Sequence, residues 1–226
     1  MESDLDLASI YRRRFSGPEL RRRNAVWRAL CRSFFQRFVA ADATVVDVGA
    51  GFCEFINNIE CRHRVAVDAG ELTAEFAAPD VEVHRAAATD LRGIPPASAD
   101  VVFMSNLLEH LPDKRAVQAA VAEVERVLRP GGRFLILQPN VRFAYREYWD
   151  FFDHQVPLSD RSLVELLELS GFEVERVIPR FLPYTTKSAV PQHPWLVGLY
   201  VRVPLLWRLL GKQAFVAARK RVVAAS

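Results

Sequence analysis

The chain has 226 residues, of which 50% are hydrophobic and 25% are charged. This composition excludes a disordered protein, which has too little apolar surface to offset its ordering entropy. Three cysteines without a C-x-x-C pair predict reduced thiols rather than a disulfide framework or a zinc site. The acidic start does not resemble a signal peptide, and no apolar run reaches the roughly 18 residues of a spanning helix. We therefore expect a cytoplasmic protein.

The net charge of +3 conceals an asymmetry along the chain. Residues 1–175 hold all 27 acidic residues and 21 of the 30 basic residues, whereas residues 176–226 hold nine basic residues and no acid. The last part of the chain is therefore electrostatically distinct from the rest.

Residues 8–40 carry apolar side chains at three- and four-residue spacings, which predicts helix. Gly17-Pro18 interrupts the pattern, so we expect a short helix followed by a longer one. Two arginine triplets, 12–14 and 21–23, fit either a nucleic-acid surface or solvated helix faces, and we favour the solvated faces. Residues 1–40 are expected to form an N-terminal helical cap.

Short β-branched runs alternate with helix-compatible stretches over residues 41–180, the expected core domain. The predicted strands are 44–48, 64–68, 81–84, 99–104, 132–138 and 172–178. The predicted helices are 52–60, 71–77, 114–128 and one that Ser159 or Asp160 opens and Gly171 closes. This alternation predicts an α/β fold, with a Rossmann-like, doubly wound, mainly parallel sheet and helices on both faces.

A glycine-containing turn follows the first predicted strand, in Val46-Asp-Val-Gly-Ala-Gly-Phe-Cys-Glu54. Glycine is needed where the backbone takes a positive φ or approaches a ligand closely, and doubly wound sheets bind ligands at such turns. Asp68 ends the second strand 17 residues after Gly51, where an acid can accept hydrogen bonds from both hydroxyls of a ribose. Glu54 stands where a dinucleotide-binding loop has its third glycine, so it would repel a pyrophosphate and tolerate a cation. The turn favours a nucleoside without phosphates.

Four motifs resemble, in order and spacing, those of the class I S-adenosylmethionine-dependent methyltransferases. They are the D-x-G-x-G turn, the acid after the second strand, the segment from Asp100 to Pro112, and Val127-Leu-Arg-Pro-Gly-Gly-Arg-Phe-Leu-Ile136. The resemblance covers about residues 40–178 and implies S-adenosylmethionine (SAM) as the cofactor. Tyr148-Trp-Asp-Phe-Phe-Asp-His154 and Phe181-Leu-Pro-Tyr-Thr-Thr-Lys-Ser188 further resemble a bacterial subgroup that acts in glycan or secondary-metabolite pathways.

The resemblance implies a cofactor site at the carboxyl ends of the strands. The residues that it assigns to this site are Asp47, Gly49, Gly51, Asp68, Ala87, Ala88, Asp90, Ser105 and Asn106. The first three would contact the methionine portion of SAM, Asp68 the ribose, residues 86–90 the adenine, and residues 105–106 the methyl donor. Two positions depart from the pattern. Cys53 replaces a small glycine, and Ala87 replaces an acid that binds the adenine amino group, a role left to backbone carbonyls or Asp90.

Two histidines are candidates for the base that would take a proton from a hydroxyl acceptor. His154 follows the fifth strand, and Asp150 or Asp153 could orient its imidazole, so it is the preferred candidate. His110 could act as a base, bind a divalent ion with Glu109, or only organise its loop. One Glu-His pair without further spaced acids is a thin basis for a metal site, so we predict no metal.

Residues 181–226 are expected to form a basic, apolar, helical tail, with Pro204 dividing two short helices. Tryptophans and basic residues without acids suit peripheral contact with a membrane, but the same helices could cover the core, which we prefer. Tyr184, Thr185 and Lys187 would offer hydroxyls and a cation to a polar or anionic acceptor.

The predicted function is SAM-dependent methylation of a small-molecule or glycan acceptor at a hydroxyl oxygen. The alternatives are a lipid-phase or quinone-like acceptor, and a scaffold protein that keeps the fold without catalysis. Nucleic acid is not an expected partner, because residues 1–175 have a net charge of −6. In addition, Ser105-Asn-Leu-Leu stands where many base-amino methylases have Asn/Asp-Pro-Pro-aromatic.

Overall fold

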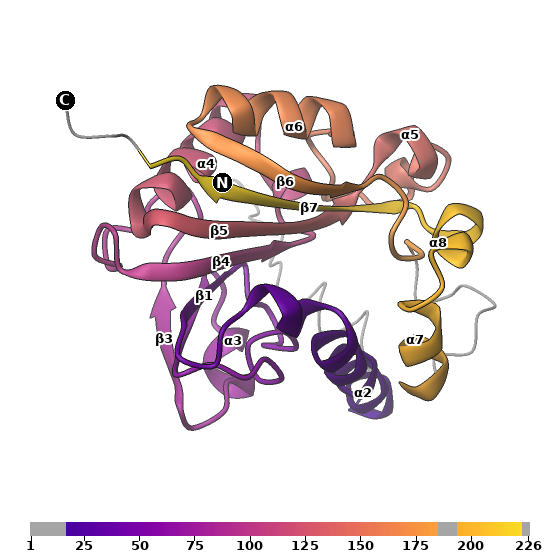
Figure 1. The fold of residues 1–226 in the computed structure, drawn as a ribbon, viewed down its shortest axis with the longest axis horizontal. Coiled ribbons are helices and arrows are strands. Elements are labelled where there is room, and N and C mark those ends of the chain that lie inside the picture. Colours follow the sequence, from indigo (N-terminus) through magenta and orange to yellow (C-terminus); the bar gives the residue numbers. More distant parts are fainter. Residues whose placement is uncertain (1–16, 185–193, 223–226) are drawn as a thin grey trace, which may run out of the picture.

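The computed structural model describes residues 17–184 and 194–222, and its centre is a seven-stranded sheet (Figure 1). The strands are β1 (Thr44–Val48), β2 (His63–Asp68), β3 (Val81–Arg85), β4 (Ala99–Ser105), β5 (Leu128–Pro139), β6 (Phe172–Ile178) and β7 (Gln213–Lys220). Their order across the sheet is β3-β2-β1-β4-β5-β7-β6. Strand β7 runs antiparallel to β5 and β6, and the other neighbouring pairs are parallel. The predicted α/β fold and its six predicted strands are confirmed.

The strand order reverses between β1 and β4, which are neighbours in the sheet. At such a switch point the connections leave toward opposite faces, and a crevice forms at the carboxyl ends of the two strands. Gly49 and Gly51 follow β1, and Asn106 follows β4; all three residues have positive φ. The sheet therefore brings the two loops together at one edge.

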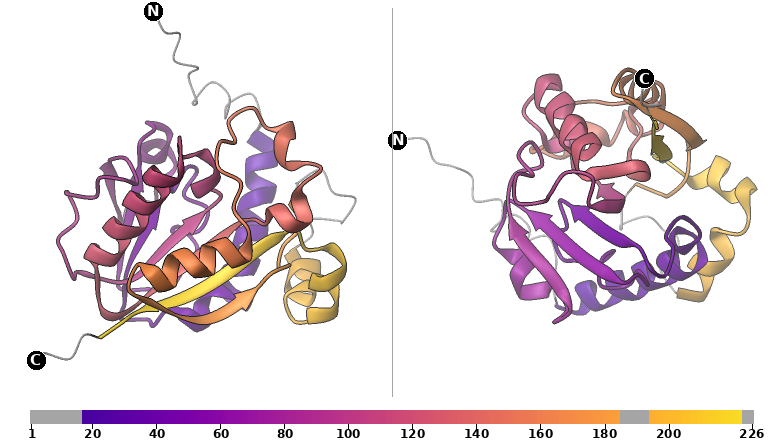
Figure 2. Two further views of the ribbon diagram at one scale, coloured as in Figure 1. Left: turned by 90° about the horizontal axis from the view of Figure 1, so that it is seen from above. Right: turned by 60° about the vertical axis from the view of Figure 1, so that its left-hand side comes forward.

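Helices cover both faces of the sheet, as predicted. They are α2 (Gly17–Ser33), α3 (Leu72–Phe76), α4 (Lys114–Val127), α5 (Val141–Ala144), α6 (Asp160–Leu169), α7 (Pro194–Tyr200) and α8 (Pro204–Leu210), with 3-10 turns η1 (Phe35–Phe38), η2 (Leu108–His110) and η3 (Tyr148–Asp150). Helices α4 and α6 lie on one side, and α2, α7 and α8 on the other (Figures 1 and 2). Alternate strand residues feed two cores: Val46 packs in the core of α4 and α6, and Val45 in that of α2.

The segment 52–60 is a series of turns, so the predicted helix there is wrong. Cys53 has a φ of 57°, in the left-handed region, two residues after Gly51, which also has a positive φ. A left-handed residue at the second position of the expected helix disrupts its first turn. Side chains hold the segment instead, and Asn57 Nδ2 donates to the carbonyl oxygen of Phe76 at 2.8 Å.

The predicted helical tail ends at Leu210, and Gln213–Lys220 form β7 inside the sheet, which corrects the prediction. Three alanines in this stretch favour helix by intrinsic propensity. Residues 213–218 are all buried between β5 and β6, and this packing outweighs the propensity.

The two helices before β7 are divided at Pro204, as predicted, and cover the core beside α2. Trp207 and Tyr200 are buried, and Trp207 Nε1 donates to the carbonyl oxygen of Tyr200 at 2.8 Å. Tyr200 in turn donates its hydroxyl to the carbonyl oxygen of Phe181 at 2.6 Å. None of the helices within the described ranges has the length and apolarity needed to cross a membrane.

Candidate functional site

The turn after β1 lies next to the end of β2. Gly49 has a φ of 75° and Gly51 a φ of 50°. A Cβ on Gly49 would lie 2.8 Å from the side chain of Leu107, so glycine is required there for space as well as for φ. A Cβ on Gly51 would have no heavy atom of the described residues within 4 Å, so this backbone faces open space that a ligand can enter.

Asp68 joins the end of β2 to this turn. One carboxylate oxygen accepts a hydrogen bond from the backbone N–H of Gly51 at 2.8 Å, and the other accepts one from Gly70 at 2.8 Å. A carboxylate oxygen can accept further hydrogen bonds beside these. The acid is therefore positioned at the crevice with both oxygens able to receive hydroxyl donors.

Two further acids lie behind the turn. Burial, and to a lesser degree the charges of Asp68 and Glu54, raise the pKa of Asp47 to about 8 against a backbone hydrogen bond from Ile56. Glu54, expected at the mouth of the turn, is instead nearly buried and paired with Arg23 of α2 at 2.7 Å. Sequence reasoning missed this pair, because nothing near Arg23 indicates a partner 31 residues away.

The predicted adenine side is the loop after β3. Ala88 is buried, whereas Ala87 is exposed and its carbonyl oxygen accepts from the N–H of Asp90 at 2.9 Å. The carboxylate of Asp90 binds the guanidinium of Arg92 at 2.5 and 2.6 Å. A cavity of about 300 Å³ lies between the ends of β2 and β3 and residues 90–94. Asp90 borders this cavity, but its carboxylate is already engaged.

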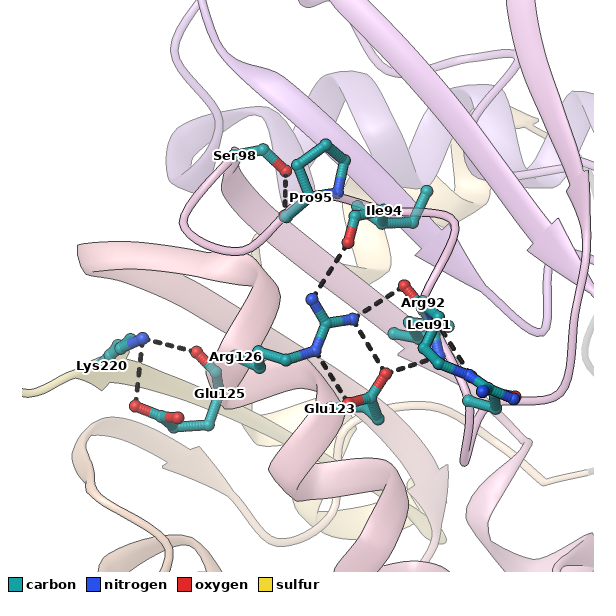
Figure 3. Close-up of polar contacts among 10 residues, drawn as sticks. Leu91, Arg92, Ile94, Pro95, Ser98, Glu123, Glu125, Arg126 and Lys220 are labelled. Carbon is teal, nitrogen blue, oxygen red and sulfur yellow. Dashed lines mark hydrogen bonds and ion pairs between the residues drawn. The ribbon is translucent and has the colours of Figure 1, made fainter.

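The loop at this cavity is fastened to α4 (Figure 3). Arg126 donates to the carbonyl oxygens of Leu91 at 2.8 Å and Ile94 at 3.1 Å. Glu123 binds Arg126 at 2.8 Å and accepts from the N–H of Leu91 at 2.6 Å. The pair of Arg126 and Glu123 therefore holds the loop by the N–H of Leu91 and by the carbonyl oxygens of Leu91 and Ile94.

Ser105 and Asn106 end β4 beside the glycine turn. Asn106 has a φ of 48°, and its backbone N–H donates to the carbonyl oxygen of Leu137 on β5 at 2.8 Å. Its side-chain amide donates to Ser105 Oγ at 3.1 Å and is exposed. The positive φ turns the chain sharply, so Leu107 contacts Gly49 across the switch point.

A cluster of Glu109, His110 and His154 follows β4. Each residue offers one ligand atom, and these atoms lie within 4.8 Å of one another. Glu109 is 2% exposed and His154 is 7% exposed, while His110 is half-buried. Burial, and to a lesser degree the charge of Asp153, raise the pKa of Glu109 to about 8 against a hydrogen bond from its own backbone. The structure thus brings the two predicted histidines together with Glu109, the acid that the sequence pairs with His110, and shows that this acid is buried.

Asp153 lies next to this cluster and contacts His110. Asp150 and Asp153 are the two acids expected to orient His154, and the carboxylate of Asp153 lies 3.4 Å from Nδ1 of His110. His154 packs among aromatic rings, stacked on Phe151 at 5.0 Å between ring centroids. The Tyr184 hydroxyl approaches the His154 ring at 3.4 Å, and Thr185 and Lys187 lie outside the described residues.

Comparison with known proteins shows similarity to methyltransferases. The family model described as a methyltransferase domain matches residues 46–136, from β1 into β5. A protein of Mycolicibacterium smegmatis, described as a probable SAM-dependent methyltransferase, is 32% identical over 169 residues. That match covers 71% of this chain and 62% of the relative, so the chain spans less than two thirds of that relative's length.

Solved structures share the fold at low identity. A SAM-dependent methyltransferase of Archaeoglobus fulgidus aligns over 96% of this chain and 100% of its own, with a TM-score of 0.66 and 20% identity. One of Thermotoga maritima aligns over 95% and 96%, with a TM-score of 0.64 and 19% identity. The [4+2]-cyclase SpnF aligns over 80% and 76%, with a TM-score of 0.58 and 18% identity. The chain therefore has the Rossmann-like methyltransferase fold. In sequence, residues 46–136 match the family model of a methyltransferase domain.

Proposed function

We propose that the protein is an enzyme that binds SAM and transfers its methyl group to a hydroxyl oxygen of a small-molecule or glycan acceptor. The single observation that carries the proposal is the contact between Asp68 and the Gly51 backbone at 2.8 Å. It joins a ribose-binding acid to a turn that faces open space, at the switch point of the sheet.

The charges of the site fit this cofactor. When bound, SAM supplies a methyl group on a cationic sulfur, which is electrophilic without further activation. Asp68 lies at the turn and Asp47 behind it, and in their ionised forms these carboxyl groups suit a cation and oppose a phosphate, whereas Glu54 is already paired with Arg23. The remaining task of the chain is to orient an acceptor and take its proton.

The acceptor side would lie at the cluster of His110 and His154. His154 remains the proposed base, and Asp153 next to His110 makes that histidine the alternative. Replacing His154 with alanine should lower kcat by about 100-fold and leave the Kd for SAM within twofold, because general bases contribute roughly that much to rate. An unchanged kcat would transfer the role to His110.

Calorimetry with SAM and its demethylated product tests the proposed cofactor. Asp68→Ala should raise both Kd values about 100-fold, since two hydrogen bonds to a charged acceptor contribute about 3 kcal/mol together. Asp68→Asn, which keeps an acceptor oxygen for Gly51, separates loss of the ribose contact from loss of the turn. Asp80→Ala is the matched control, because Asp80 is an exposed acid that pairs with Arg64. No heat of binding at millimolar SAM would contradict the proposal.

A second candidate is methylation of a lipid-phase acceptor, and one surface favours it. Helices α7 and α8 expose apolar side chains on the side away from the core; these residues, the α7–α8 surface, are Trp195, Leu199, Leu205, Leu209 and Leu210. Arg202 and Arg208 are exposed on the same segment, and no acid follows Glu175 in the sequence. Apolar side chains flanked by cations suit an anionic lipid surface.

Sedimentation with phospholipid vesicles tests this second candidate. We expect binding to vesicles that contain phosphatidylglycerol and loss of at least about 80% of it in Leu205→Ser/Leu209→Ser, because two apolar anchors are removed. Leu169→Ser is the control, since Leu169 is 82% exposed on α6. Equal sedimentation of all three proteins would remove the lipid-phase candidate and leave the first proposal intact.

A further inference from the structure

The cluster at η2 contains an unusual buried carboxylate. Glu109 Oε2 is buried without a hydrogen-bond partner among the described residues. No lysine or arginine of the described chain forms an ion pair with Glu109. Burying a carboxyl oxygen without a partner is costly, so a ligand that fills this place would be favoured.

Two imidazoles face the same point. The ligand atoms of Glu109, His110 and His154 lie within 4.8 Å of one another, and the two rings stand edge to face with centroids 4.9 Å apart. Donors coordinated to one ion at about 2.1 Å each lie about 4.2 Å apart or less. Small rotations of three side chains would therefore bring all three donors onto one ion.

The surrounding contacts resemble the outer shell of a metal site. Nδ1 of His110 lies 3.1 Å from the backbone oxygen of Asp153 and 3.4 Å from its carboxylate. Such partners fix the tautomer of a metal-binding histidine and direct its other nitrogen to the ion. The backbone oxygen of Glu109 accepts from the N–H groups of Gln155 at 2.7 Å and Val156 at 3.1 Å. These two hydrogen bonds join the loop that carries His154 to η2, so the segments that carry the three donors are held together.

We propose that Glu109, His110 and His154 bind one divalent transition-metal ion, of the class of Zn²⁺, Mn²⁺ or Co²⁺. Two imidazoles and one carboxylate favour such ions over Mg²⁺ and Ca²⁺, which prefer oxygen ligands. Three protein ligands leave a coordination position for an oxygen of the acceptor. This catalytic consequence rests on the proposed function, whereas metal binding itself does not.

The proposal changes the role of the two histidines. As ligands they would hold the ion, and the ion would orient the acceptor oxygen and favour loss of its proton. The cluster, rather than one imidazole, would then serve the acceptor.

Binding of Co²⁺ and Zn²⁺ to the metal-stripped full chain tests the site. We expect one Co²⁺ per chain, with visible d–d absorption that one equivalent of Zn²⁺ removes. Glu109→Gln and His154→Gln should each raise the Kd for Co²⁺ at least about 100-fold, and Asp153→Asn about 10-fold, as found for outer-shell partners. Circular dichroism and SAM binding of the same samples show whether each variant is folded.

Glu82 provides a matched control elsewhere on the surface. It lies between His63 at 3.0 Å and His84 at 2.6 Å, and its side chain is 51% exposed. Glu82→Gln should leave Co²⁺ binding unchanged. Absence of stoichiometric Co²⁺ binding, or binding lost in Glu82→Gln and kept in Glu109→Gln, would overturn the proposal. Retained SAM binding in that case would leave the proposed function standing, and lost SAM binding with retained Co²⁺ would do the reverse.

Discussion

The proposed cofactor side and the proposed acceptor side of the site are built in different ways. On the cofactor side, Gly51 and Asp68 sit on loops directly after adjacent parallel strands, and one backbone hydrogen bond joins them. On the acceptor side, Glu109, His154 and Tyr184 come from segments far apart in the sequence and meet through the packing of loops. The geometry of the proposed cofactor side is therefore set by adjacent strands, while that of the proposed acceptor side depends on contacts between segments distant in sequence.

The largest expected effect concerns β7, the strand that lies between β5 and β6 in the sheet. Deleting residues 213–226 removes β7 and leaves β5 and β6 without their shared neighbour. We expect no cooperative thermal transition and aggregation in size-exclusion chromatography, because two ladders and a buried strand are lost. Deleting residues 223–226 alone should keep the parent Tm. A cooperative transition near the parent Tm in the longer deletion would show that β7 is dispensable.

The second prediction probes charge on the cofactor side. Because the pKa of Asp47 is raised to about 8, chiefly by burial, this acid is mostly protonated at neutral pH in the protein alone. A cationic ligand favours its ionised form, so SAM affinity should rise by up to about 10-fold per pH unit toward pH 8 and level off above it. Calorimetry at several pH values measures this rise, and Asp47→Asn should give a flat profile. Equal pH profiles for Asp47→Asn and the parent would exclude Asp47 from cofactor binding.

The same group has an opposite effect on stability. A carboxyl whose pKa is higher in the folded state than in the unfolded state contributes stability that is full below about pH 4, its unfolded pKa. That contribution is lost as the pH rises through 8. Chemical denaturation should therefore show that Asp47→Asn gains stability over the parent at pH 8 relative to pH 5.

A smaller effect is expected at the clasp between α2 and the glycine turn. Arg23→Ala leaves Glu54 nearly buried without its cation, and we expect a loss of about 2 kcal/mol in the free energy of unfolding, reduced by partial exposure of the pair. Urea denaturation measures it. Adding Glu54→Gln should recover at least half of the loss, and a double variant as unstable as the single one would show that packing of Arg23, rather than its charge, holds the helix.

The smallest effect is local. Arg126→Ala removes the donors to the carbonyl oxygens of Leu91 and Ile94. The amides of residues 91–94 should then exchange hydrogen about 10-fold faster, since the lost hydrogen bonds contribute about 1–2 kcal/mol to closing this loop. Arg92→Ala, at an arginine whose side chain is 86% exposed, should leave the exchange unchanged. Equal exchange in both variants would show that the loop is held by its own backbone.

The sequence predicts the cofactor side better than the acceptor side for a physical reason. Strand ends, glycines and Asp68 are local features, and they reach the expected places because parallel strands align their carboxyl ends. The helix over 52–60 failed because Cys53 adopts a positive φ that its residue type does not announce. The prediction of helix for the alanine-rich residues of β7 failed because burial between two strands decides their conformation.

At the acceptor side, the types of the reactive residues were readable but their partners were not. The sequence indicates both histidines, but not that the carboxylate of Asp153 lies 3.4 Å from Nδ1 of His110. The burial of Glu109 and the pairing of Arg23 with Glu54 depend on how separate elements pack. No spacing rule within one segment encodes such contacts.

The interior position of β7 has a consequence for synthesis. During translation β5 and β6 leave the ribosome before β7, which pairs with both of them. Until β7 is made, the facing edges of β5 and β6 have no partner strand. The nascent chain can form the parallel part of the sheet, from β3 to β5, early. The sheet is complete only when residues 213–220 pair with both β5 and β6. Chaperone dependence and inclusion-body formation should therefore respond most strongly to substitutions in this last strand.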